Sequence, residues 1–305
     1  MAGASLSDTR RKAIAGIGLA AAAFAVFTVM DCTVKALSGR YHVLQIVWLQ
    51  AAAAFAVMLV YAWRRGGPTR LRTRRLPLHI LRGCLATASI SLVFTSYAVL
   101  PLADVYAVLF TIPLMVAALG AVLLGERISP ARLLAIALGF SGVMVAVAPS
   151  GAGLGGWLAL LPLAGAAVSA LGHVLVRHMQ TTETTESFGV YGNLVVLLAA
   201  TPAMPWLFVI PTVADLLLAM LGGMLCAFGS VLLVQAYRAA PVAVVAPLQY
   251  TQMPYAVLAG LFLFGDLPQP AVVAGAAIVA ASGVFLLVAE THGIGRGRAA
   301  ARATA

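Results

Sequence analysis

Asp31 and Lys35 stand four residues apart within a long apolar run. If this run is helical, positions i and i+4 share one face, so we expect an ion pair between the two side chains. A charge in hydrocarbon costs at least about 2.5–3.5 kcal/mol, and such residues usually face a cavity or a partner. Asp31 could therefore bind a substrate amine or a proton. The alternative is a structural pair near the surface, where Lys35 can extend to the interface.

His173 occupies a later apolar run, and an alignment of the two halves of the chain, adjusted by two residues, places it opposite Asp31. An imidazole could titrate near neutrality there, or donate hydrogen bonds to a substrate carboxylate. The alternative is a packing histidine near a membrane interface. The remaining histidines fall at loop or interface positions, and we assign no chemistry to them: His42, His79, His178 and His292.

The apolar run at 242–264 contains an unusually polar segment, and its counterpart in the first half is rich in aromatic residues. Polar groups inside a membrane normally face protein or water, and prolines free backbone carbonyls that need other partners. The candidates for substrate contact are Tyr106, Phe110, Thr111, Gln249, Tyr250 and Gln252, and the candidate hinges are Pro113, Pro247 and Pro254. The alternative is hydrogen bonding between helices, which contributes about 0.6–2 kcal/mol per contact.

Two further groups of residues complete the candidates. Ser91 and Thr95 share a face four residues apart and could contact a substrate, although small residues most often serve close helix packing. Glu126 and Asp266 fall in short connections at helix ends, where we expect hinge and fold roles rather than substrate contact.

The composition decides the class of protein that must position these residues. Of 305 residues, 62% are hydrophobic and 9% are charged, whereas ordinary globular domains have roughly 45–50% and about 25%. No soluble fold could bury that much apolar surface. The formal net charge of +10 arises from basic residues in the gaps between apolar runs, a pattern of membrane topology rather than of nucleic-acid binding.

A helix needs about 20 mainly apolar residues to cross a bilayer, because its backbone polar groups must be paired internally. Ten such stretches are predicted, at 13–37, 43–63, 78–100, 103–124, 132–148, 157–178, 188–208, 214–237, 242–264 and 271–290. The fold class is therefore an all-α membrane protein with a small-molecule substrate and the lipid bilayer as its surroundings. A monomer is compatible with the sequence.

The two halves of the chain repeat each other. A shift of 140 positions superposes Gly83 on Gly223, Tyr97 on Tyr237, Pro101 on Pro241, Gly120 on Gly260 and Pro130 on Pro270. We predict two five-helix units, 1–150 and 151–305, which must have opposite orientations because five is odd. Inverted repeats are typical of secondary transporters, with the substrate site near the midplane between them.

The basic residues orient the chain. With the N-terminus in the cytoplasm, the cytoplasmic segments receive the basic run at 10–12, the arginine-rich linker at 64–75 and the basic tail at 296–302. Only Arg40 then falls in an outside loop. By the positive-inside rule we predict that both termini are cytoplasmic, in a bacterial-type inner membrane.

The run Leu-Gly-Glu-Arg-Ile-Ser-Pro at 124–130 resembles the EamA-type drug/metabolite transporters, whose halves each close the fourth helix with a Gly-Glu motif. The segments at 97–103 and 237–243 resemble the link between the third and fourth helices of that family. Asp266 stands where the family usually has Glu. The resemblance implies a ten-helix basket with a central cavity lined mostly by helices 1, 3, 4, 6, 8 and 9.

An enzyme is not expected, because the sequence has no phosphate loop, no metal-ligand spacing and no nucleophile motif. We expect no cofactor, metal or nucleic-acid partner. The leading hypothesis is a secondary transporter that exports small amphipathic metabolites, most plausibly amino acids including aromatic ones, by alternating access. The alternative is a carrier of other organic solutes, such as drugs, nucleobases or cofactor-like metabolites.

Overall fold

The computed structural model describes residues 2–123, 130–147, 158, 160–179, 183–240 and 245–303, and these ranges contain helices and no strand. Six helices are long and apolar enough to cross a membrane, and three shorter apolar helices accompany them, at Leu133–Val145, Leu160–Val176 and Pro270–Phe285. The all-α membrane fold is therefore confirmed, while the count of ten crossings stays a prediction.

The helices of the described ranges divide between the two halves of the chain. The first half contains α1 (Ala2–Ser38), α2 (Val43–Arg64), η1 (Gly67–Leu71), α3 (Leu76–Val99), α4 (Leu102–Leu109), α5 (Ile112–Leu123) and α6 (Pro130–Val147). The second half contains α7 (Leu160–Met179), α8 (Thr185–Ala200), η3 (Thr201–Ala203), α9 (Met204–Leu207), α10 (Val213–Ala239), η4 (Ala246–Thr251), α12 (Gln252–Ala259), η5 (Gly260–Phe264) and α13 (Pro270–Ala303).

Two of the predicted spans are interrupted. The span expected at 103–124 is divided into α4 and α5, and Pro113 is the second residue of α5, where a missing N–H is tolerated. The span expected at 242–264 consists of the 3₁₀ helix η4, the α-helix α12 and the π-helical turn η5. Gly265 ends that turn with a φ of 70°, which glycine adopts without strain. Both breaks lie in segments for which hinges were predicted.

The helix packing relates the two halves. α1 lies along α10 just as α7 lies along α3, and α2 packs on α8 while α6 packs on α13. When each helix is replaced by its counterpart in the other half, the α1–α10 pair becomes the α7–α3 pair. The α2–α8 and α6–α13 pairs each join two counterparts, so they stay the same. Two equivalent units would pack in this way. The division at residue 150 stays a prediction, because the residues around it lie outside the described ranges.

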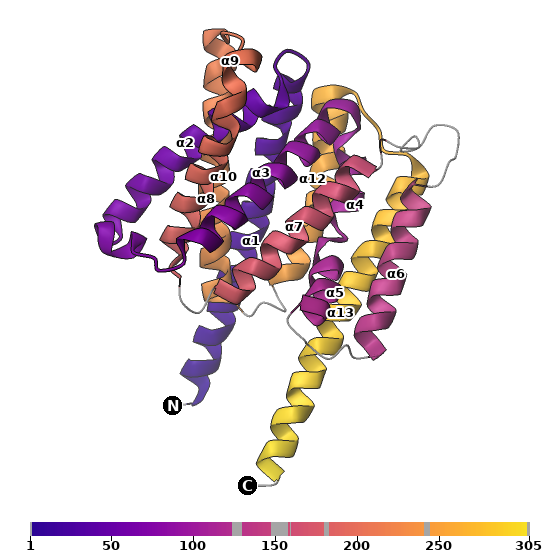
Figure 1. Ribbon diagram of the computed structural model, residues 1–305. Helices are drawn as coiled ribbons and strands as arrows, with labels where there is room; N and C mark the ends of the chain where they lie inside the picture. Colours follow the sequence, from indigo (N-terminus) through magenta and orange to yellow (C-terminus); the bar gives the residue numbers. More distant parts are fainter. Residues whose placement is uncertain are drawn as a thin grey trace.

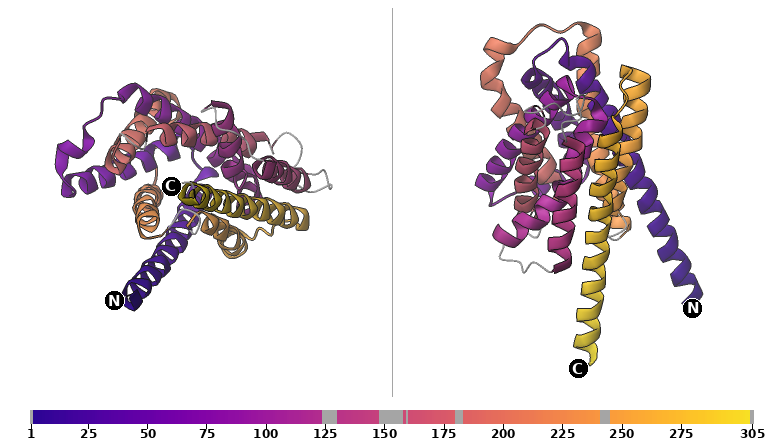
Figure 2. Two further views of the ribbon diagram at one scale, coloured as in Figure 1. Left: turned by 90° about the horizontal axis from the view of Figure 1, so that it is seen from below. Right: turned by 90° about the vertical axis from the view of Figure 1, so that its right-hand side faces the viewer.

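Both termini lie at the same end of the molecule, where α1 and α13 extend beyond the other helices (Figures 1 and 2). Closest approach between helices depends on glycine: a Cβ on Gly142 of α6 would lie 2.8 Å from the carbonyl oxygen of Gly275 of α13. Large apolar side chains remain exposed, among them Phe262 at 78% and Leu217 at 63%. Such side chains suit contact with lipid rather than with water.

Candidate functional site

Asp31 lies at the centre of a buried group of polar side chains contributed by four helices. Its Oδ2 accepts a hydrogen bond of 3.1 Å from the hydroxyl of Tyr97, at the end of α3, and a second from the hydroxyl of Tyr106 on α4. Gln252, the first residue of α12, lies with its amide nitrogen 3.5 Å from the Tyr106 hydroxyl. The structure thus brings together three of the predicted substrate-contact residues and adds Tyr97, which the sequence marked only as a repeat position.

The predicted ion pair between Asp31 and Lys35 is not formed. Lys35 Nζ lies 2.6 Å from Oδ2 of Asp266 and donates to the carbonyl oxygen of Leu100 at 3.0 Å. The same ammonium lies 5.2 Å from the ring centroid of Phe264. The i,i+4 spacing was a poor guide because two tyrosine hydroxyls satisfy Asp31, and the long lysine side chain reaches partners beyond its own helix.

A second acid accompanies this ion pair. Asp104, in the first turn of α4, is buried, and its Oδ1 has no hydrogen-bond partner among the described residues. Asp104 interacts electrostatically with both Asp266 and Lys35. Asp266, predicted as a hinge residue, therefore belongs to a charged cluster that joins α1, α4 and the segment before α13.

A row of aromatic rings runs from the Asp31 group to η4. Its members in order are Phe94, Tyr97, Tyr106, Phe110 and Tyr250, with successive ring centroids 5.0–6.3 Å apart. The last pair is edge-to-face, a favourable geometry that contributes about 0.5–1.5 kcal/mol. The structure therefore unites the predicted aromatic residues of both halves in one layer.

The predicted hydroxyl groups serve their own helices. Thr111 donates to the carbonyl oxygen of Val108 at 2.6 Å, and Thr95 donates to that of Ser91 at 2.7 Å. Gln249 is half-buried in η4 and forms no part of the Asp31 group. Local bonds of this kind are common for threonine in helices, and they leave these side chains less free to bind a solute.

Three neighbouring cavities lie among α1, α2, α3, α7, α8 and α10. The central cavity, of about 200 Å³, is lined by Phe27, Met30, Gln50, Phe94 and Asn193 among others. The α8 cavity, of about 300 Å³, shares Asn193 with it and adds Arg82, Phe188, Gly192 and Ser230. The α7 cavity, of about 220 Å³, lies between α3 and α7 and is lined by Arg82, Ser89, Ser169 and His173.

The central cavity adjoins the Asp31 group through Phe94, which lines the cavity and packs against Tyr97. His173 lies in the α7 cavity, with Nδ1 2.7 Å from the carbonyl oxygen of Ser169, and is not a partner of Asp31. The sequence missed Gln50, Asn193 and Arg82, because only the packing of α2, α3 and α8 places them on two adjoining cavities that share Asn193. Glu126 lies outside the described residues, as does the side chain of Pro247.

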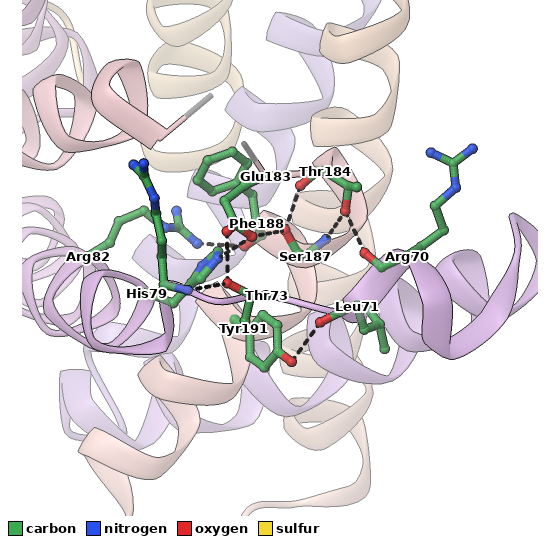
Figure 3. A network of polar contacts seen from close by, with 11 residues as sticks. Arg70, Leu71, Thr73, His79, Arg82, Glu183, Thr184, Ser187, Phe188 and Tyr191 are labelled. Atoms are coloured by element: carbon green, nitrogen blue, oxygen red, sulfur yellow. Dashed lines mark hydrogen bonds and ion pairs between the residues drawn. The ribbon is translucent and has the colours of Figure 1, made fainter. Parts of the chain in front are cut away.

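His79 was assigned to a loop or interface, and the structure corrects this. Its side chain is fully buried, with Nε2 3.0 Å from Glu183 Oε2. Glu183 also accepts hydrogen bonds from Thr73 at 2.8 Å and from Ser187 at 3.2 Å (Figure 3). The position looked like an interface because α3 begins only three residues earlier, but Glu183 and the rings of Phe188 and Tyr191 pack against the imidazole.

This network joins the halves at the end where the termini lie. Thr184 donates to the carbonyl oxygen of Arg70 at 2.6 Å, and Tyr191 donates to that of Leu71 at 2.8 Å (Figure 3). Burial alone would raise the pKa of Glu183, but the hydrogen bonds from His79, Thr73 and Ser187 outweigh it and hold the pKa below its ordinary value.

Residues 14–148 match the EamA-like transporter family. The chain is 31% identical to a riboflavin transporter of Rhizobium johnstonii, over 79% of this chain and 84% of the relative. It is 23% identical to an S-adenosylmethionine uptake transporter of Rickettsia bellii, over 93% and 97%. It is 26% identical to a pseudopaline exporter of Pseudomonas aeruginosa, over 89% and 95%.

The fold of a solved structure, titled only as the crystal structure of a protein, agrees with a TM-score of 0.62. That alignment covers 91% of this chain and 96% of the other at 15% identity, and it supports the fold alone. The helical membrane fold and the relatives define a multi-pass membrane transporter of small molecules, not an enzyme. The chain belongs to the EamA-like transporter family.

Proposed function

We propose that this transporter carries a neutral, planar, ring-containing metabolite of the cofactor class. The observation that carries the proposal is the lining of the central cavity. Its walls are apolar and aromatic, with Phe27 and Phe94, and its hydrogen-bonding groups are the amides of Gln50 and Asn193. No charged side chain occurs among the described residues that line it.

This lining favours a flat heterocycle over a zwitterion. Aromatic rings stack on planar solutes, and a few well-placed amides orient their ring nitrogens and carbonyl groups. An amino acid would instead bring an ammonium and a carboxylate into the cavity, and each ion needs a partner of opposite charge to offset its lost hydration. A relative named as a riboflavin transporter, 31% identical, supports the same substrate class.

Export of amino acids remains the competing proposal, and one feature favours it. Asp31 is a buried carboxylate whose hydrogen-bond partners are two neutral tyrosine hydroxyls, so a substrate ammonium could pair with it. However, Asp31 is itself 5% exposed and is not among the residues that line the central cavity. This geometry gives an amino acid a less direct route to the carboxylate.

The remaining proposals concern architecture. We propose two inverted five-helix units that move by alternating access, with both termini on the cytoplasmic side. The basic linker at 64–75 and the shared position of the two termini support this orientation. The ion pair of Lys35 with Asp266 and the Glu183 network lie toward opposite ends of the helices, and each could hold one end closed.

Counterflow in proteoliposomes tests the proposed substrate. Vesicles are preloaded with unlabelled riboflavin, S-adenosylmethionine or phenylalanine, and the matching labelled solute is added outside. We expect uptake of riboflavin above that of empty vesicles. Uptake of phenylalanine but not of riboflavin would instead support the amino-acid proposal. Repeating the assay with the labelled solute inside and the unlabelled solute outside measures the preferred direction.

A further inference from the structure

Arg82 is a charged residue inside a membrane-spanning helix. It lies six residues after the first residue of α3, which is about 9 Å along the helix axis. Its side chain borders both the α7 cavity and the α8 cavity. Among the described residues that line the three cavities, it is the only permanently charged one.

The guanidinium of Arg82 is incompletely satisfied. Nη2 donates to the carbonyl oxygen of Phe188 at 2.5 Å, and the guanidinium carbon lies 5.4 Å from the centroid of the Phe188 ring. Its Nε is buried without a hydrogen-bond partner, and no carboxylate in the described part of the chain forms an ion pair with it. A guanidinium has five N–H donors, so most of its hydrogen-bonding capacity is unused.

The backbone of α8 is shaped to admit this side chain. A Cβ added to Gly192 would collide with Nη2 of Arg82, so an alanine there would displace the flexible end of the arginine side chain from its present position. The next residue, Asn193, lines both the α8 cavity and the central cavity. The charge is therefore held at the edge of the proposed substrate site.

We propose that Arg82 recognises the substrate, donating paired hydrogen bonds to an acceptor-rich edge such as neighbouring carbonyl oxygens on a heterocyclic ring. The proposal rests on the substrate class proposed above and names the group that the transporter recognises. An unpaired charge inside a membrane span is unfavourable, and a bound solute that accepts its hydrogen bonds would offset that penalty. The planar guanidinium is suited to two parallel bonds to adjacent acceptors.

Kinetic measurements on two sets of variants test this role. Arg82→Met removes the hydrogen-bond donors, and Arg82→Lys keeps the charge but loses the planar guanidinium. Gly192→Ala moves the guanidinium of Arg82 without changing its chemistry. The controls are Arg64→Met, which removes a charge at the exposed end of α2, and Gly18→Ala, whose added Cβ meets nothing within 4 Å. KM and kcat are measured by counterflow, and elution as a single species with an unchanged melting temperature verifies folding.

For Arg82→Met we expect KM to rise by about tenfold or more, the range expected for hydrogen bonds to a charged group. Arg82→Lys and Gly192→Ala should give smaller increases, and both controls should match the wild type. A KM for folded Arg82→Met within twofold of the wild type would overturn the proposal. If that variant does not fold, wild-type KM values for both Arg82→Lys and Gly192→Ala would overturn it.

The same assay separates this proposal from the proposed substrate class. A wild type that carries phenylalanine but not riboflavin overturns the class, and the Arg82 variants are then compared on the amino acid, whose carboxylate offers the same paired acceptors. A wild type that carries riboflavin with unchanged kinetics in the Arg82 variants overturns only the role of Arg82. A wild type that carries none of the three solutes overturns both.

Discussion

Lys35 and Asp266 form an ion pair of 2.6 Å although 231 positions separate them in the chain. The lysine lies near the end of α1, and the aspartate lies between η5 and α13. The side chains are 14% and 32% exposed, so water screens the pair only partly. The contact joins the first half of the chain to the second at the end opposite the termini.

We expect Asp266→Asn to weaken closure at this end. The substitution should lower the free energy of unfolding by about 1 kcal/mol, as for a partly exposed pair. In a background with Ser at positions 84 and 226, the buried thiol of Cys32 on α1 should react faster with a maleimide. Arg40→Gln is the control, because Arg40 is 58% exposed in its pair with Asp215. Equal labelling rates in both variants would contradict a closing role for Lys35 and Asp266.

The hydrogen bonds to Asp31 predict an order of stability. Tyr106→Phe leaves a buried carboxylate without one donor, which costs about 1–3 kcal/mol, whereas Asp31→Asn keeps an acceptor oxygen for the tyrosines. Melting temperatures should therefore fall more in Tyr106→Phe than in Asp31→Asn. Counterflow by Asp31→Asn at the wild-type rate would show that the carboxylate serves structure alone, and a folded but inactive variant would show that transport needs its charge.

The Glu183 network predicts loss of stability in acid. Because the folded-state pKa of Glu183 is lowered, its contribution is present above the ordinary glutamate value of about 4.3 and is lost as the pH falls through the lower folded value. We expect the melting temperature to decline less steeply below about pH 5 in Glu183→Gln than in the wild type. Glu186→Gln, three residues later in the first turn of α8 and outside this network, is the control and should retain the wild-type slope. Parallel curves for wild type and Glu183→Gln would refute this.

Asn193 offers a test of the central cavity itself. Asn193→Leu keeps a similar volume but removes the amide that borders two cavities, so KM for riboflavin should rise severalfold with little change in kcat. The control is Leu198→Ala on the same helix, whose side chain is 58% exposed on the outside of the body. Should the control alter KM as much as Asn193→Leu does, the effect would have to come from helix packing rather than from the cavity.

Several parts of the site were accessible from sequence because they depend on local pattern. Asp31, Tyr106 and Gln252 were singled out as polar groups inside apolar runs, where burial in hydrocarbon demands a partner. The structure places all three in one group. The partner of Lys35 could not be read in this way, since helical spacing names only neighbours on the same helix and gives no weight to Asp266.

The sequence by itself determined the helical membrane class and the family, because the length of each apolar run and the position of its charges are set along the chain. Only the tertiary structure decided that His79 is buried against Glu183 and that Arg82 faces the cavities with Gly192 beside it. Burial and hydrogen bonding depend on which helices pack together. Those contacts join residues from opposite halves, and their geometry arises only when the chain is folded.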